Sequence, residues 1–166
     1  FKKITALSLS SAMIFCSFSA CDKKDEKENL NGADIACEWS NLSIDGGGFV
    51  PGIVYSTAQE GLAYARTDIG GAYRYDKDIE KWIPITDFFG QDEWNLIGIE
   101  SIAADPVDPK RLYIACGTYA NENGCIISSA DYGETWSRFD LDTYCGGNLS
   151  GRGVGERLMV DPNDNS

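Results

Sequence analysis

From residue 39 onward, short apolar runs rich in β-branched and aromatic side chains alternate with clusters of Gly, Asp, Asn and Pro. No stretch keeps the 3.6-residue spacing of an amphipathic helix, so the pattern predicts an all-β chain of short strands separated by turns. We expect a first set of strands at about 49–56, 62–67, 72–76 and 82–86. A second set is expected near 99–104, 111–117, 125–129 and 136–140, and a third begins near 157–161.

The strand sets repeat along the chain. Tyr64 matches Tyr113 at a shift of 49 residues, and Trp82 matches Trp136 at a shift of 54. Four short strands recurring about every 50 residues are typical of a β-propeller blade. The sequence therefore predicts an all-β fragment of a seven-bladed propeller, with about two and a half blades in residues 39–166.

The sharpest local motif is Ser-x-Asp-x-Gly-x-Thr-Trp at 129–136, an Asp-box of the kind found in sialidase-like and other propellers. Asp131 can accept backbone N–H groups of its own turn, Gly133 permits a positive φ, and the Trp136 ring can be buried between blades. Residues 76–82 form a degenerate copy of this motif that keeps an Asp and a Trp. The motif predicts a blade and gives Asp131 a structural role. The Asp-Pro turns at 105–109 and 161–164 are interpreted in the same way, as turns and not as calcium sites.

The N-terminal residues have the pattern of an export signal. Lys2 and Lys3 precede an uncharged run at 4–20, Cys21 follows, and a charged run occupies 22–28. This order predicts a lipoprotein signal peptide at 1–20, cleavage before Cys21 and lipid attachment to its sulfur. The alternative is ordinary secretion with cleavage near Ala20. We expect a flexible tether at 21–38, and an outer-membrane or cell-surface lipoprotein or else an extracellular protein.

The amino-acid composition excludes several kinds of partner and of catalytic site. The 166 residues include 14 Lys plus Arg, 26 Asp plus Glu and no His, for a net charge of −12. A strongly acidic chain is repelled by phosphate, so we expect no nucleic-acid partner, and membrane contact only through a lipid anchor. Without His, the chain offers no Ser-His-Asp catalysis and no His-ligated zinc. We expect no cofactor, no metal and a monomer.

Four cysteines remain besides Cys16 and Cys21. Because an exported protein meets oxidising conditions, disulfides are expected. Cys116 and Cys125 flank the loop at 117–124, and facing positions on antiparallel strands lie within disulfide reach. A Cys116–Cys125 disulfide is our prediction, and the alternative is that Cys37, Cys116, Cys125 and Cys145 are buried thiols.

Candidate ligand loops follow from the blade pattern. If the Asp-box joins the third and fourth strands, the loops at 66–71 and 117–124 and the connections at 86–95 and 144–152 lie at the opposite end. These loops combine Gly with aromatic, carboxylate, Asn and Arg side chains, a composition that suits a sugar. Asp68 stands out, since two glycines follow it closely and Arg66 could keep it ionised. The alternative is that Asp68 only bonds the backbone of its own turn.

Five blocks, in order from about Trp39 to Asn165, carry a family resemblance. They are GGGFVPGI at 46–53, YARTDIGGAYR at 64–74, WNLIG at 94–98, ADPVDP at 104–109 and GRGVGER at 151–157. Together they resemble the start of glycoside hydrolase family 74, the xyloglucanases and oligoxyloglucan reducing-end-specific cellobiohydrolases. The resemblance implies two facing seven-bladed propellers with the glucan chain in the cleft between them.

The resemblance also implies an activity. It implies inverting cleavage of the β-1,4-glucan backbone of xyloglucan, with Asp68 as general base and the general acid in the second propeller, outside this chain. Trp94, Tyr119, Arg152 and Arg66 are candidate substrate contacts, although such side chains can equally pack within blades. The fragment alone is expected to be inactive. The alternatives are a non-catalytic propeller that binds glycans or proteins and, less favoured, a sialidase.

Overall fold

The structure is a computed structural model that describes residues 29–30, 33–34, 38–39, 41 and 43–165. The chain divides into two compact units, Phe1–Ser40 and Asn41–Ser166. In the first unit, β1 (Asn29–Leu30) pairs antiparallel with β2 (Ala33–Asp34), within the range expected to be a tether. The signal peptide, Cys21 and Cys37 lie outside the described residues and stay predictions. In the described part of the chain, no helix has the length and apolar character needed to span a membrane.

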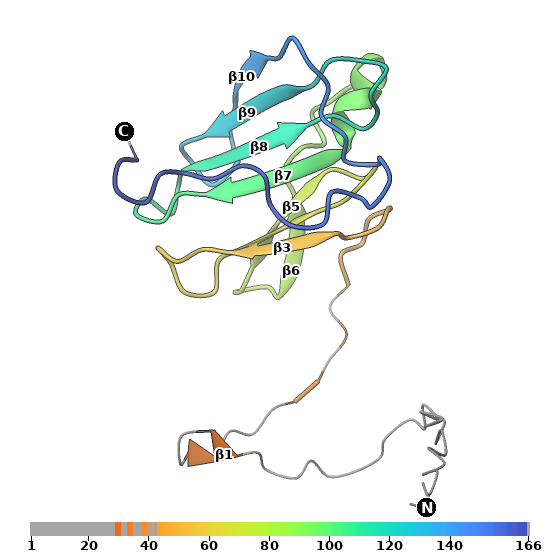
Figure 1. Ribbon diagram of the computed structural model, residues 1–166. Helices are drawn as coiled ribbons and strands as arrows, with labels where there is room; N and C mark the ends of the chain where they lie inside the picture. The colour runs from red at the N-terminus through yellow and green to blue at the C-terminus, as the bar shows by residue number, and fades with distance from the viewer. Residues whose placement is uncertain (1–28, 31–32, 35–37, 40, 42, 166) are drawn as a thin grey trace, which may run out of the picture. The chain divides into compact units, whose positions relative to one another are not determined.

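The second unit consists of two four-stranded antiparallel sheets, each with its strands in chain order (Figure 1). All eight strands expected between residues 49 and 140 are present. The first sheet comprises β3 (Gly52–Tyr55), β4 (Ala63–Arg66), β5 (Ala72–Asp76) and β6 (Lys81–Pro84). The second comprises β7 (Ile99–Ala104), β8 (Leu112–Cys116), β9 (Cys125–Ser129) and β10 (Ser137–Asp140).

Two segments differ from the expected elements. A 3₁₀ helix, η1 (Gln91–Ile97), occupies the connection between the sheets, where the sequence shows no helical period. Residues 157–161 form no strand. The amides of Arg157 and Leu158 donate instead to Ser101 Oγ, at 2.8 and 2.9 Å. Because a strand is defined by backbone bonds to a neighbouring strand, this side-chain anchoring leaves the segment irregular.

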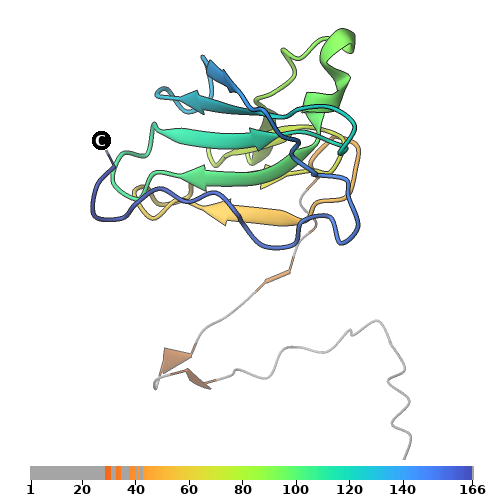
Figure 2. The same ribbon diagram turned by 45° about the horizontal axis from the view of Figure 1, so that its top comes forward.

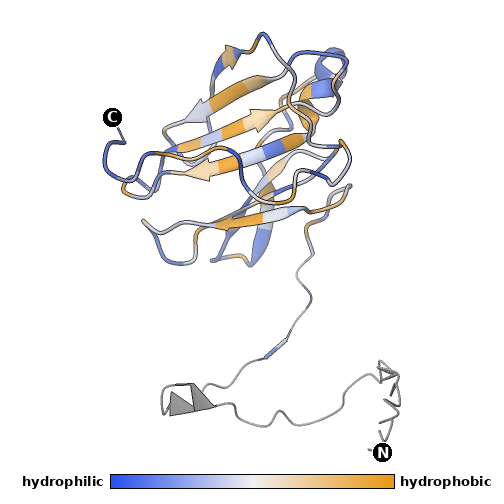
Figure 3. Cartoon of the chain, viewed as in Figure 1, coloured by the Kyte–Doolittle hydropathy of each residue, from blue (hydrophilic) through white to orange (hydrophobic). Residues whose placement is uncertain are grey.

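The larger hydrophobic core lies between the two sheets, and a smaller cluster of Ala63, Ala65, Tyr73 and Trp82 belongs to the first sheet alone. Tyr64, Ile99, Leu112 and Ile114 are fully buried, and all four residues of β4 are buried. Apolar residues occupy much of β7, β8 and β9, with a hydrophilic stretch inside β7 (Figure 3). The inner strand β7 packs against β3 and β4 of the first sheet, as the turned view in Figure 2 also shows. This packing of inner strands is the geometry expected of neighbouring propeller blades.

The turn at 129–136 has the expected internal bonds. Asp131 Oδ1 accepts the Thr135 amide at 2.9 Å and the Ser129 hydroxyl at 2.7 Å, and Gly133 has a φ of 88°. Trp136 Nε1 donates to the Ile85 carbonyl at 3.1 Å, which joins the second sheet to the end of the first. Hydrogen bonds from Thr135 and Ser129 lower the pKa of Asp131 to about 2. The hydrogen bonds within this turn therefore favour the ionised form of the Asp131 carboxylate.

An ion pair between a fully buried arginine and a partly exposed glutamate ties the C-terminal segment to both sheets. Arg66, at the end of β4, has a fully buried side chain whose Nε donates to Glu156 Oε1 at 2.7 Å. Its Nη2 donates to the Gly153 and Gly155 carbonyls, at 2.7 and 3.2 Å. Glu156 Oε2 accepts the Ser101 hydroxyl and the Ile102 amide of β7, both at 2.7 Å. The segment therefore runs beside β7, as Figures 1 and 2 show in blue.

Protonation of Asp131 should weaken the fold only in strong acid. The pKa of this carboxyl is lowered on folding, so its contribution is present above the ordinary pKa of about 4 and is lost as the pH falls toward about 2. We expect the difference in Tm between the native protein and Asp131→Asn to shrink over that interval. Thermal melts of the complete protein at stepwise pH values measure it. A difference that stays constant down to pH 2 would contradict the assignment.

Removing the carboxylate partner of the buried Arg66 should be costly. Glu156→Gln leaves the fully buried Arg66 guanidinium without its carboxylate, and an unpaired buried charge costs about 3–5 kcal/mol. The control is Arg157→Met, because Arg157 is half-exposed and lies 3.6 Å from Glu100. Exposed pairs contribute about 0–1 kcal/mol. Denaturant unfolding of the complete protein should separate the two variants clearly, and equal losses would show that the Arg66–Glu156 pair does not anchor the segment.

Candidate functional site

One end of the two sheets carries the loops singled out in the sequence. In an up-and-down sheet successive turns alternate between ends, so the β4–β5 loop and the β8–β9 loop lie opposite the turn at 129–136. Backbone bonds join these loops across the two sheets: the Gly71 amide donates to the Ile97 carbonyl and the Thr118 amide to Asn95, at 2.8 and 2.6 Å. The expected clustering of loops at this end is confirmed.

The β4–β5 loop is held in shape by Thr67 and not by Asp68. Thr67 Oγ1 donates to the Gly71 carbonyl at 2.9 Å and accepts the Gly70 amide at 2.7 Å. The Thr67 amide also donates to Gly71, at 3.0 Å. The interpretation in which Asp68 serves only to bond its own turn is therefore wrong, because a neighbouring hydroxyl already does so.

The Asp68 carboxylate is bonded by two distant segments. Its Oδ1 accepts the Phe49 amide at 2.8 Å, and its Oδ2 accepts Nε of Arg152 at 2.8 Å. The Asp68 amide donates back to the Phe49 carbonyl at 3.0 Å. The Asp68 side chain is only 6% exposed, whereas the Arg152 side chain above it is 46% exposed. Residues 49, 68 and 152 thus fix one carboxylate just beneath the surface.

Glycines allow this close approach. Gly48 has a φ of 101°, and a Cβ there would lie 2.8 Å from Asp68 Oδ1. A Cβ at Gly70 would lie 2.0 Å from the Gly47 carbonyl oxygen. Gly70 therefore admits another part of the backbone, the run at 46–48, which packs directly on the loop. A side chain at either position would displace the carboxylate or its loop.

Arg66 does not occupy the site expected of it. We predicted that it would contact substrate and keep Asp68 ionised. Its side chain is fully buried, and its donors are directed to Glu156 and to main-chain carbonyls. A side chain without exposed surface cannot bind a ligand, so the substrate-contact prediction is wrong. The cation beside Asp68 is Arg152 instead, since the connection at 144–157 folds back over the first sheet.

Two aromatic rings lie side by side at the same end. Trp94 of η1 and Tyr119 of the β8–β9 loop are 43% and 38% exposed, and their ring centroids are 6.0 Å apart at an interplanar angle of 53°. Asn148 Nδ2 donates to the Tyr119 hydroxyl at 2.7 Å, and Asn95 Oδ1 accepts the Tyr119 amide at 3.0 Å. The two rings, contributed by separate connections, form a partly exposed surface of a kind that can stack on an apolar sugar face.

Sequence reasoning missed two residues of this region. Asn148 orients the Tyr119 hydroxyl, and Glu156 anchors the segment that carries Arg152. Both lie within blocks or loops that the sequence singled out. Their partners are 29 and 90 residues away along the chain, however, so no local spacing identifies them.

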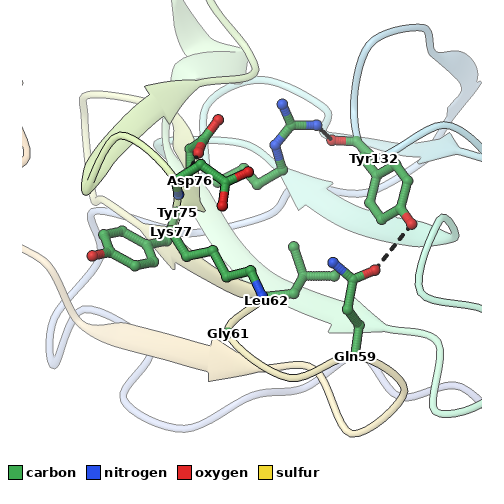
Figure 4. Close-up of a pocket in the computed structure, with 9 residues that line it drawn as sticks. Gln59, Gly61, Leu62, Tyr75, Asp76, Lys77 and Tyr132 are labelled. Carbon is green, nitrogen blue, oxygen red and sulfur yellow. Dashed lines mark hydrogen bonds between the residues drawn. The ribbon is translucent and has the colours of Figure 1, made fainter.

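A separate hollow of about 210 Å³ opens at the other end of the sheets, lined by Gln59, Lys77 and Tyr132 among others (Figure 4). The Tyr132 hydroxyl donates to Gln59 Oε1 at 3.0 Å, and Arg74 Nη1 donates to the Tyr132 carbonyl at 2.9 Å. Burial raises the pKa of nearby Tyr64 to about 12, so its hydroxyl stays protonated. Both positively and negatively charged side chains line the hollow, which lies at the end of the sheets opposite Asp68.

The described cysteines are free thiols. Cys116 and Cys125 are direct cross-strand partners, as expected, and Cys145 is buried with them. The predicted Cys116–Cys125 disulfide is absent from this structure and stays a prediction. Burial, with the nearby Glu100 charge, raises the pKa of Cys145 to about 12. Among the described residues, no group of three or more His, Cys, Asp or Glu side chains is arranged to hold a metal ion.

Comparison with known proteins adds to this picture. No family model matches the sequence. A xyloglucanase from Paenibacillus sp. is 54% identical over 132 residues, which cover 76% of this chain and 13% of that protein. A xyloglucanase from Acetivibrio thermocellus is 53% identical over 136 residues, covering 79% of this chain and 16% of that one. The chain thus spans 13–16% of the length of these curated relatives.

A solved structure agrees with the sequence matches. The crystal structure of a GH74 xyloglucanase from Xanthomonas campestris superposes with a TM-score of 0.70 at 49% sequence identity, covering 77% of this chain and 18% of that one. The likeness includes both the propeller fold and the sequence. The chain therefore belongs to glycoside hydrolase family 74, of whose members it covers a part.

Proposed function

We propose that this chain supplies one side of the active site of a xyloglucan-degrading enzyme, with Asp68 as the general base of an inverting glycoside hydrolysis. The observation that carries the proposal is the fixed Asp68 carboxylate, bonded by residues 49 and 152 and not by its own turn. The names of relatives about 50% identical to this chain support xyloglucan as the substrate.

The bonding of Asp68 suits a base. A carboxylate has about four lone-pair positions, and the Phe49 amide and Arg152 Nε use two of them. Two positions therefore remain for a water molecule. The Arg152 side chain bonded to Oδ2 is 46% exposed, so the ion pair reaches the protein surface.

In the proposed reaction, Asp68 takes a proton from water while the water oxygen attacks the anomeric carbon. A carboxylic acid on the other side of the sugar donates its proton to the departing glycosidic oxygen. An inverting site needs about 6.5–9.5 Å between the two carboxyl groups so that the water fits. We place this acid in another part of the complete protein, so the chain alone holds half of the catalytic pair.

The aromatic surface fits the same substrate. The Trp94 and Tyr119 rings can stack on the apolar faces of glucose units, while Asn148 orients the Tyr119 hydroxyl. Xyloglucan is neutral, so the acidic net charge of −12 neither attracts nor repels it. Substrate recognition would therefore rest on stacking and hydrogen bonds.

Replacement of Asp68 is the direct test. Asp68→Asn removes the basic oxygen but keeps an acceptor for the Phe49 amide, so the fold is retained. We expect the hydrolysis of xyloglucan by the complete protein to fall by at least about 100-fold, as is usual when a general base is lost. Reducing-end release and Tm are measured together. Native turnover in a folded Asp68→Asn variant would remove Asp68 from the mechanism.

A non-catalytic glycan-binding propeller is the second candidate. It is favoured by the low exposure of Asp68 beside the well-exposed Trp94 and Tyr119 rings. The two functions differ in one measurement on the native protein. Binding of xyloglucan oligosaccharides without any cleavage, weakened by Trp94→Ala, would support the binding function and exclude the hydrolase.

A further inference from the structure

We infer that Arg152 is a positioning residue for Asp68, held against it by the Arg66–Glu156 ion pair, and not a substrate contact. The inference rests on the proposed function of Asp68 as base. It assigns Arg152 a role different from the sugar contact suggested by its loop position.

The first observation is the geometry of the ion pair. Arg152 Nε lies 2.8 Å from Asp68 Oδ2, and the carboxylate is nearly buried. A charge-assisted bond to a carboxylate that has little contact with water is stronger than one at the surface. With the Phe49 amide on Oδ1, the two donors fix the carboxylate plane. Loss of Arg152 would leave Oδ2 without its partner and the carboxylate free to rotate.

The second observation is the backbone beneath Arg152. Residues 151, 152, 153 and 155 all have positive φ, and Arg152 is the one among them with a side chain, at 51°. The left-handed region is costly for a residue with a Cβ, so glycine would be preferred at position 152 on conformational grounds alone. A side chain kept in an unfavourable conformation is typical of positions where the side chain has a specific task.

The third observation explains what holds that conformation. Arg66 Nη2 bonds the Gly153 and Gly155 carbonyls, and Glu156 is bonded to Arg66 and to β7. These contacts fix the residues that follow Arg152, namely 153–156. On its N-terminal side, the Arg152 amide donates to the Leu149 carbonyl at 2.8 Å. The Arg66–Glu156 pair therefore acts on Asp68 indirectly, by holding Arg152 beside its carboxylate.

The experiment compares Arg152→Gly with Arg152→Ala in the complete protein. Both substitutions remove the guanidinium, but the glycine substitution also removes the conformational cost of a positive φ at position 152. We expect kcat on xyloglucan to fall by about 10- to 100-fold in both, the loss typical of a hydrogen bond to a charged group, while KM changes less than about two-fold. The Tm of Arg152→Gly should equal or exceed that of Arg152→Ala. Added guanidinium ion should restore part of kcat in both.

Two controls accompany these variants. Arg111→Ala removes an arginine at the opposite end of the second sheet, paired with Asp108 at 3.6 Å, and should keep native kcat with and without guanidinium. Asp68→Asn should be inactive and not rescued. This last variant separates the two proposals, because an active Asp68→Asn enzyme defeats the proposed function itself.

Specific results would overturn the inference. Native kcat in Arg152→Gly would show that Asp68 needs no cation, and a raised KM with native kcat would make Arg152 a substrate contact. If Arg152→Ala lost activity while Arg152→Gly kept it, the loss would come from the backbone and not from the guanidinium. Each of these results could occur while Asp68→Asn remains inactive, so the proposed function would stand.

Discussion

The ion pair between the buried Arg66 and Glu156 is the interaction on which this end of the molecule depends. A fully buried guanidinium is tolerated only when its charge and its donors are satisfied, and here one carboxylate and main-chain carbonyls do so. Since Arg66 ends a strand of the first sheet and Glu156 is bonded to the first strand of the second, the pair links both sheets. The pair also fixes the path of residues 151–155, which directly precede Glu156.

Site geometry follows from that anchoring. Arg66 of β4 bonds the carbonyls of the 151–155 turn. Arg152 of this turn donates to Oδ2 of the Asp68 carboxylate, and the Phe49 amide donates to Oδ1. Glycines at 46–48 let the opening run pack against the loop that carries Asp68. Three segments far apart in sequence thus converge on one acidic group. Such convergence gives a carboxylate a fixed orientation that a turn alone would not provide.

Much of the fold could be predicted from the sequence. The strand positions followed from alternating apolar runs and turn residues, and the repeat of Trp82 at Trp136 revealed two related sheets. The 3₁₀ helix was missed because seven residues with little amphipathic period leave no pattern. The strand expected at 157–161 was wrong, since strand formation needs a hydrogen-bonding neighbour and Ser101 bonds these amides instead.

For the site, the sequence by itself determined that Asp68 lies in a glycine-rich loop, at the sheet end opposite the 129–136 turn and alongside Trp94 and Tyr119. These conclusions depend on the alternation of turns, which is a local property of antiparallel strands. Only the tertiary structure decided which cation meets Asp68. Arg66 is two residues away, yet its side chain is buried and faces Glu156, whereas Arg152 arrives from 84 residues along the chain. Burial and the path of a distant segment set charge pairing, and neither is encoded by local spacing.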